Sequence, residues 1–314
     1  MPSRARILPD PPPTFAPAPA WARRLGSAEA ADDAGFLAGA ALAILHPIAR
    51  HEHPLGGLLR QRLALACAVA IAQQEGRTED EATLRDHWYL RRDGDDPGPA
   101  GRWLRAWRRL GERDALRSDD WPINLAAMLA LRDDDALKEI IAFAIEHLKG
   151  DGSAVRAAAA VAATSLRLRP DSRPLALWLA DAVLAARMSW PAPAPMLAAA
   201  HIKRGDLRHT AAQAEGASPW IVACNLAYAR GAAAAADLYA DLARRAAHLL
   251  EVAPKLRGKD ADRMVQILLT EDAQPAGAGG TASDRSARRL FERLVSLGVV
   301  RELTGRPTFR LYGL

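Results

Sequence analysis

The sequence has only two cysteines and few aromatic residues, which make up 5% of its 314 residues. Cys67 and Cys224 stand far apart in apolar helical patterns, which excludes a disulfide-based scaffold and indicates buried, reduced thiols in a cytoplasmic protein. Alanine is abundant instead. Because alanine favours helices and aromatic residues favour strands, the composition predicts closely packed helices.

Long apolar runs are also lacking. The longest, 35–49, is shorter than a membrane span and contains His46 and Pro47, so it predicts a core helix and no membrane association. Prolines follow Arg4 and Arg6, where a secretion signal needs an apolar core. The proline-rich residues 1–33 are therefore interpreted as a flexible N-terminal tail.

Motifs for common catalytic chemistry are missing as well. The sequence has no phosphate-binding Gly-Lys-Ser/Thr loop, no Rossmann glycine pattern and no Gly-x-Ser-x-Gly elbow. Two clusters of polar residues contain possible cation ligands: His46, His51, Glu52 and His53, and Asp93, Asp95 and Asp96. Histidines that cap helices or lie on the surface, and aspartates that form turns, are the favoured interpretations. We therefore expect no catalytic residue, metal, cofactor or identifiable small-molecule ligand, and no enzymatic activity.

Apolar periodicity predicts an α-helical domain over 34–253. Expected helices include 36–45, broken at Pro47, a buried helix 55–75, and a helix capped by Thr78 with Glu81. Later stretches give helices near 99–110, 122–131, 133–148, 153–168, 174–188, 195–204, 219–229 and 231–252. Pro254 and Gly258 mark the boundary of a second domain, 254–314.

Positive charge is concentrated in this second domain. Residues 281–314 hold seven arginines and three acidic residues, a net charge of +4 within a total of +5. A basic excess confined to one small element is typical of nucleic-acid binding.

The end of the chain has the element order of a winged helix. After a short helix, 260–269, and a loop, 271–280, Ser283 is expected to cap a helix whose apolar face runs from Ala287 to Leu297 and which ends at Gly298. Two strands, 299–303 and one around 309–312, would form a hairpin. Residues expected to contact DNA are Arg285, Ser286, Arg288 and Arg289 from the helix, and Arg306 and Arg310 from the hairpin.

Two alternatives remain open for these basic surfaces. Arg288 can pair with Glu292 on a solvated helix face while the module packs only against protein, and the helix that normally precedes a recognition helix is missing from the 271–280 loop. Trp103 and Trp107, among Arg102, Arg105, Arg108 and Arg109, could bind single strands, but their helical spacing favours a core stripe with solvated arginines.

Three stretches resemble the proteobacterial family called domain of unknown function 1403: "RTEDEATLRDHWYLRRDGDDPGPAGRWLRAWRRLG" (77–111), "MSWPAPAPML" (188–197) and "SARRLFERLVSLGVVRELTGRPTFRLYGL" (286–314). The ending also resembles the winged helix appended to Fic-type nucleotidyl transferases. The catalytic loop of that family has its nearest counterpart in "HPLGGLLRQ" from His53, where Leu58 and Leu59 stand in place of an anion cradle.

The sequence thus predicts a multi-helix bundle with a C-terminal winged helix that binds double-stranded DNA, as a transcriptional or plasmid-associated regulator. The helical domain would form a homodimer or receive a signal. A protein-interaction adaptor is the alternative, followed by a degenerate Fic-like enzyme. The DNA target, the oligomer and the ligand of the helical domain are not encoded in any motif we recognise.

Overall fold

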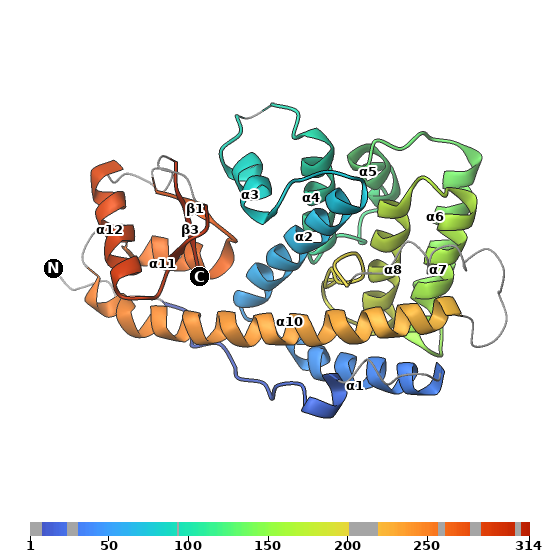
Figure 1. The fold of residues 1–314 in the computed structure, drawn as a ribbon, viewed down its shortest axis with the longest axis horizontal. Helices are drawn as coiled ribbons and strands as arrows, with labels where there is room; N and C mark the ends of the chain where they lie inside the picture. The colour runs from blue at the N-terminus through green and yellow to red at the C-terminus, as the bar shows by residue number, and fades with distance from the viewer. Residues whose placement is uncertain are drawn as a thin grey trace.

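The computed structural model describes residues 8–23, 31–92, 94–200, 219–256, 261–276, 284–304 and 309–314, without the side chains of residues 31 and 284–286. The chain is mainly helical and has a small three-stranded antiparallel sheet at its C-terminal end (Figure 1).

The helices and strands follow one another in chain order. The helices are η1 (Ala20–Arg23), α1 (Ala31–Arg50), α2 (Leu55–Gln74), α3 (Glu81–Tyr89), α4 (Gly98–Leu110), α5 (Trp121–Met128), α6 (Asp135–His147), α7 (Ala154–Leu168), α8 (Arg173–Arg187), α10 (Pro219–Val252), η3 (Ala253–Lys255), α11 (Ala261–Thr270) and α12 (Asp284–Ser296). The strands are β1 (Gln274–Pro275), β2 (Arg301–Glu302) and β3 (Leu311–Gly313).

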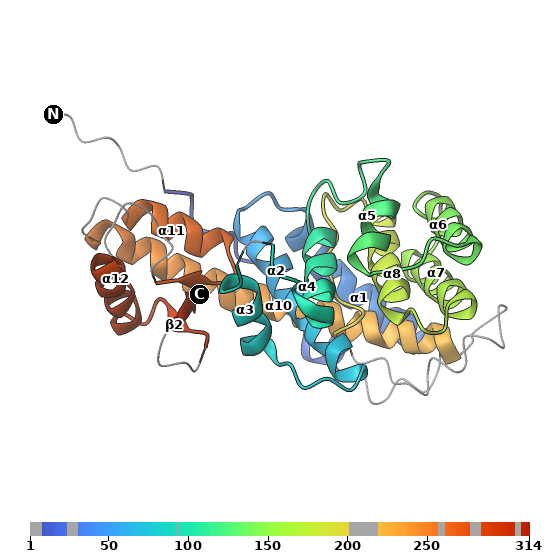
Figure 2. The ribbon, with the colours of Figure 1, turned by 90° about the horizontal axis from the view of Figure 1, so that it is seen from above.

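Helix α10 is the longest element and lies along one side of the molecule (Figures 1 and 2). Helix α1 packs along it, while α11 and α12 lie at one end of the molecule and α6 and α7 at the other. The prediction of two helices separated near Gly231 is wrong, because α10 continues through this glycine. A Cβ atom at Gly231 would lie 3.0 Å from Cβ of Met196, so the residue permits a close approach of two chain segments.

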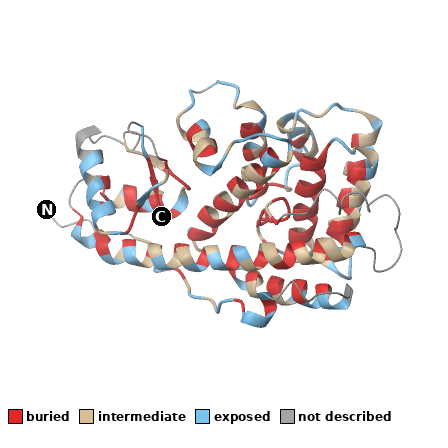
Figure 3. Cartoon of the chain, in the orientation of Figure 1, coloured by how far each residue is buried: buried red, intermediate tan, exposed pale blue. Residues whose placement is uncertain are grey.

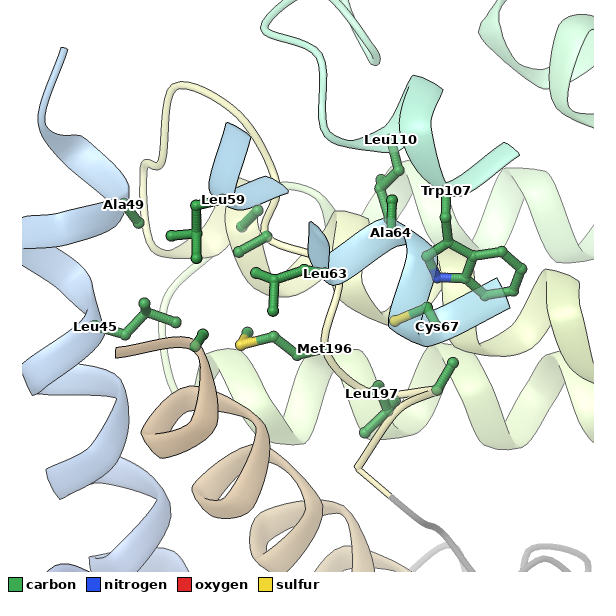
Figure 4. Close-up of a cluster of buried hydrophobic side chains, with 14 of the residues drawn as sticks. Leu45, Ala49, Leu59, Leu63, Ala64, Cys67, Trp107, Leu110, Met196 and Leu197 are labelled. Carbon is green, nitrogen blue, oxygen red and sulfur yellow. The ribbon is translucent and has the colours of Figure 1, made fainter. Parts of the chain in front are cut away.

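The hydrophobic core is built around α2, as its all-round apolar sequence predicts (Figure 4). Leu63 and Cys67 of α2 meet Leu45 of α1, Trp107 of α4 and Met196 in this core. The helix has the length and composition of a membrane span, but 67% of that apolar window is buried inside the protein, as in a core helix. The same core extends to Phe291 of α12, so the C-terminal elements are part of it.

Two local predictions for the first helices are wrong. Pro47 does not end α1, which continues to Arg50. Proline lacks the N–H that would bond to the carbonyl of Ala43, and both residues are exposed, so this carbonyl is not buried without a partner. The cap of α3 is Asp80, whose Oδ1 accepts the N–H of Thr83 at 2.8 Å, and not Thr78.

Residues 8–23 lie against the helices. The ring of Phe15 contacts that of Tyr239 at a centroid distance of 5.5 Å, and the Tyr239 hydroxyl donates to the carbonyl of Pro13 at 3.0 Å. Arg23 pairs with Asp237 of α10 at 2.5 Å. Residues 8–19 of this proline-rich stretch have no regular secondary structure, because proline lacks the N–H donor that a helix needs, and side-chain contacts hold the stretch on α10.

A buried carboxylate on α8, that of Asp181, positions the segment around Met196 that packs against Gly231 of α10. Asp181 is 1% exposed and accepts the backbone N–H groups of Met196 at 2.8 Å and Leu197 at 3.1 Å. Burial raises the pKa of Asp181 to about 7, although these two hydrogen bonds oppose the shift.

Candidate nucleic-acid interface

Helix α12 has one buried and one exposed face. Ala287, Phe291 and Leu294 are buried at the helical spacing that the sequence indicates. Figure 3 shows the opposite, outward side of the helix as exposed. The helix ends as predicted, because Gly298 adopts a φ of 69° and the N–H of Val299 donates to the carbonyl of Leu294 at 3.2 Å.

The three strands form an antiparallel sheet in the order β1-β3-β2. Tyr312 of β3 pairs with Gln274 of β1 and with Glu302 of β2. Its ring stacks on Phe291 at a centroid distance of 4.5 Å, which joins α12 to the central strand. The interpretation of residues 271–280 as a loop is wrong at β1, which forms only because β3 supplies its hydrogen-bond partners.

The exposed face of α12 is basic. Arg288, Arg289 and Arg293 are exposed, and within the described part of the chain none of them forms a salt bridge. In particular, no ion pair between Arg288 and Glu292 is seen there. These guanidinium groups are therefore presented to solvent rather than used for folding.

The six predicted contact residues are only partly covered by the structure. Arg288 and Arg289 lie on the exposed face of α12, and Arg310 is exposed before β3. Arg310 approaches Glu302 across the hairpin at 3.4 Å, and its side chain keeps 49% exposure. The side chains of Arg285 and Ser286, and Arg306 with the proposed Ser283 cap, lie outside the described residues.

Two exposed residues of this region were missed at the sequence level. Arg293 follows Arg289 by four residues, a spacing that places both on one face and could have revealed it. Phe309 is 76% exposed and has a φ of 55°, in the left-handed region. No sequence signal distinguishes it from the apolar residues that form the core of the hairpin.

A buried polar junction fixes the C-terminal elements to the helical part. Asp272, which is 2% exposed, pairs through Oδ1 with Nε of Arg62 at 2.5 Å and through Oδ2 with Nε of Arg85 at 2.9 Å. Gln61 adds two bonds, accepting the N–H of Asp272 at 2.9 Å and donating to the carbonyl of Thr270 at 3.0 Å. One carboxylate thus links α2, α3 and the segment between α11 and β1.

The same junction reaches the last strand. Arg62 also donates to the main-chain oxygens of Asp272 at 3.0 Å and Leu314 at 3.2 Å. Burial lowers the pKa of Arg62, while the charge of Asp272 opposes that shift. Gly313 lies between these groups, and a Cβ atom there would stand 2.6 Å from the carbonyl oxygen of Asp272. The sheet therefore has a fixed position beside α2.

The histidines near the end of α1 have hydrogen-bond partners within the protein. His46 Nδ1 accepts the indole N–H of Trp190 at 3.1 Å, and His51 Nδ1 accepts the N–H of His53. His53 Nδ1 accepts the N–H of Leu55 at the start of α2. Within the described ranges, no group of three or more His, Cys, Asp or Glu side chains gathers as metal ligands would.

The Fic-like stretch does not form an exposed phosphate-binding loop. Leu55, Leu58 and Leu59 are buried on α2, and their backbone is helical. Glu52 pairs with Arg113 at 2.9 Å, whereas Asp95 accepts the N–H of Arg92 in the loop after α3. The polar residues considered for catalysis thus have separate structural partners.

The tryptophan stripe of α4 belongs to the core. Trp107 and Leu110 are fully buried and Trp103 is half-buried, which is the arrangement that the helical spacing favours. The rings of Trp88 and Tyr89 of α3, by contrast, lie against the guanidinium group of Arg108.

The fold defines a mainly helical protein in which two final helices and a small antiparallel sheet present a basic face at one end. A family model described as "Protein of unknown function (DUF1403)" matches residues 12–314, and the chain belongs to that family. A search of curated proteins finds no match.

Proposed function

We propose that α11, the three strands and α12 form a winged helix that binds double-stranded DNA, in a cytoplasmic transcriptional or plasmid-associated regulator. The observation that carries the proposal is the set of exposed guanidinium groups on α12, a helix whose opposite face is fixed to the sheet.

The order of elements supports the winged-helix assignment. A strand, β1, follows α11, then comes α12, and the β2–β3 hairpin ends the described chain. The sheet order β1-β3-β2 places the hairpin beside the first strand, with α12 packed on it through Phe291 and Tyr312. A full winged helix has a support helix before the recognition helix, and the corresponding residues here, 277–283, lie outside the described residues.

The exposed arginines supply the chemistry for DNA contact. An α-helix fits the major groove, where an arginine fork donates two hydrogen bonds to O6 and N7 of guanine, and arginine also pairs with backbone phosphates. Arg288, Arg289 and Arg293 would face the groove from α12, while Arg310 and Arg306 would contact neighbouring phosphates from the hairpin. Arg285 and Ser286 belong to the same predicted contact set.

The C-terminal module, which runs from α11 to β3, is placed so that the exposed face of α12 is accessible. Helix α12 lies at the end of the molecule opposite α7, and its exposed face points away from the helical part (Figures 1 and 3). The junction at Asp272 holds the module in this orientation, so the helical part would act as a platform that forms a homodimer or receives a signal.

The test is a fluorescence anisotropy titration of a labelled mixed-sequence duplex at low salt. The double variant R288A/R289A should bind at least about tenfold more weakly than the parent, because two charged donors are lost. R167A removes an exposed arginine from α7, at the other end of the molecule, and is the matched control. Equal weakening by both variants, or no binding by the parent, would count against the proposal.

Exposed apolar residues favour a second candidate function, protein docking by the same module. Phe309 is 76% exposed and Val295, on α12, is 41% exposed. Apolar side chains at a protein interface resist salt, whereas phosphate contacts do not. A partner that co-purifies at high salt with the parent, but not with the F309S variant, would favour the adaptor.

A further inference from the structure

A concave site lies between α3, α4 and α5, separate from the α12 surface. Its volume is about 540 Å³, within the range of small-molecule sites. The wall combines arginines from one face of α4 with the carboxylate of Glu112, which pairs with Arg109, and with aromatic, amide and apolar groups from the neighbouring helices. The lining residues that carry the argument are Trp88, Arg105, Arg108, Arg109, Asn124 and Met128.

Arg108 is oriented by an aromatic ring. Its guanidinium carbon lies 4.8 Å from the centroid of the Trp88 ring, and only 14% of its side chain is exposed. Its polar contacts are long, at 3.3 Å to the Tyr89 hydroxyl and 3.5 Å to Glu271. A guanidinium over an aromatic face keeps its N–H groups in its own plane, where they remain available to an anion.

The neighbouring arginines differ in their partners. Arg109 pairs with Glu112 and Asp114, so its charge is already compensated. Arg105 is exposed and forms no salt bridge among the residues that the structure describes. Arg105 and Arg108 are three residues apart on one face of α4, and both line the pocket.

We propose that this pocket binds a small phosphate monoester with a flat apolar body. The phosphate oxygens accept N–H groups of Arg105 and Arg108, with the Asn124 amide as a further donor. The apolar body contacts Met128 and the accessible part of Trp88. A duplex backbone would reach Arg105, but the recessed Arg108 requires a ligand small enough to enter the pocket.

The proposal is tested by isothermal titration calorimetry of the full chain with phenyl phosphate and with inorganic phosphate. Phenyl phosphate should bind with one site per chain and more tightly than inorganic phosphate. R105Q should weaken it by about tenfold or more, because a charged donor is lost. R108K keeps the positive charge but not the two-pronged donor, so it should also weaken binding.

R167Q, on the exposed side of α7, should bind phenyl phosphate like the parent. The far-ultraviolet circular dichroism and melting temperature of each variant show that it is folded. Absence of saturable phenyl phosphate binding would overturn the proposal, as would equal affinity for both ligands or an unchanged affinity in R105Q. Binding of a single-stranded oligonucleotide alone, lost in R105Q, would assign the surface to nucleic acid instead.

Discussion

Arg62 and Asp272 form a buried ion pair, with 2.5 Å between Nε and Oδ1 and side-chain exposures of 7% and 2%. The residues are 210 positions apart, and their contact joins the central core helix to the C-terminal module. A buried pair contributes less than its Coulomb energy because both ions lose their hydration. The pair instead fixes the position of the sheet relative to α2 and α3, because Asp272 also pairs with Arg85.

Replacing Asp272 by alanine should strongly destabilise the protein. The change leaves Arg62 and Arg85 buried without their shared carboxylate, which costs about 3–5 kcal/mol when one partner of a buried pair is removed. Urea unfolding followed by circular dichroism measures the loss. The control is D135N, because the Asp135 side chain is fully exposed and its replacement should change stability by less than about 0.5 kcal/mol. Equal effects of the two changes would mean that the junction is not structurally important.

A single methyl group at Gly313 should have a similar, smaller effect. The Cβ atom of G313A would lie 2.6 Å from the carbonyl oxygen of Asp272 and 2.8 Å from Leu303, so β3 must shift at a cost of about 1–3 kcal/mol. By contrast, G39A places a methyl group in open space in the middle of α1 and should stabilise the protein by about 0.5–1 kcal/mol. Thermal unfolding of both variants checks the opposite signs, and stabilisation by G313A would contradict the close approach.

Asp181 should make the protein less stable as pH rises. Its pKa is about 7 in the folded protein and 3.8 in the unfolded reference, because burial disfavours the charged carboxylate. The favourable contribution of the protonated form is complete below pH 4 and is lost as pH rises to about 7. The titratable neighbours are Cys67 and Tyr228, and burial raises the pKa of both, so they remain neutral in this window.

The variant D181N should remove this pH dependence. Its amide oxygen can still accept the N–H groups of Met196 and Leu197, but it carries no charge. Urea unfolding at pH 5 and pH 8 should show that the stability lost by the parent, on the order of a few kcal/mol, is reduced in D181N. A pH response identical to that of the parent would exclude Asp181 as its source.

Local sequence patterns predicted most of the helical part. The apolar spacing of α2 and α12 and the cap at Gly298 are properties of a few neighbouring residues, and the structure has them as expected. Features set by distant contacts were not predictable. From the sequence, Gly231 predicts a break in the helix, because its packing against Met196 depends on a distant segment. The residues of β1 have no strand pattern of their own and form a strand by pairing with β3.

The two candidate sites also differ in whether local sequence patterns or distant contacts determine them. The exposed arginines of α12 could be predicted from its amphipathic spacing, because the apolar face is buried and the opposite, basic face must therefore point to solvent. The pocket on α4 was not predicted, since it needs Trp88 from α3 and Asn124 from α5 beside Arg108. The sequence pattern of Trp103 and Trp107 marks the opposite, buried side of the same helix.

The most direct test of the DNA-binding account is the salt dependence of duplex affinity. Each arginine–phosphate contact releases counterions and contributes roughly −0.9 to the slope of log affinity against log salt concentration. We expect a steep negative slope for the parent and for R167A, and a slope shallower by roughly 0.9 for R310A, because the exposed Arg310 is the hairpin residue proposed to contact a phosphate. Identical slopes for all three proteins, or no binding of the parent at low salt, would contradict the account.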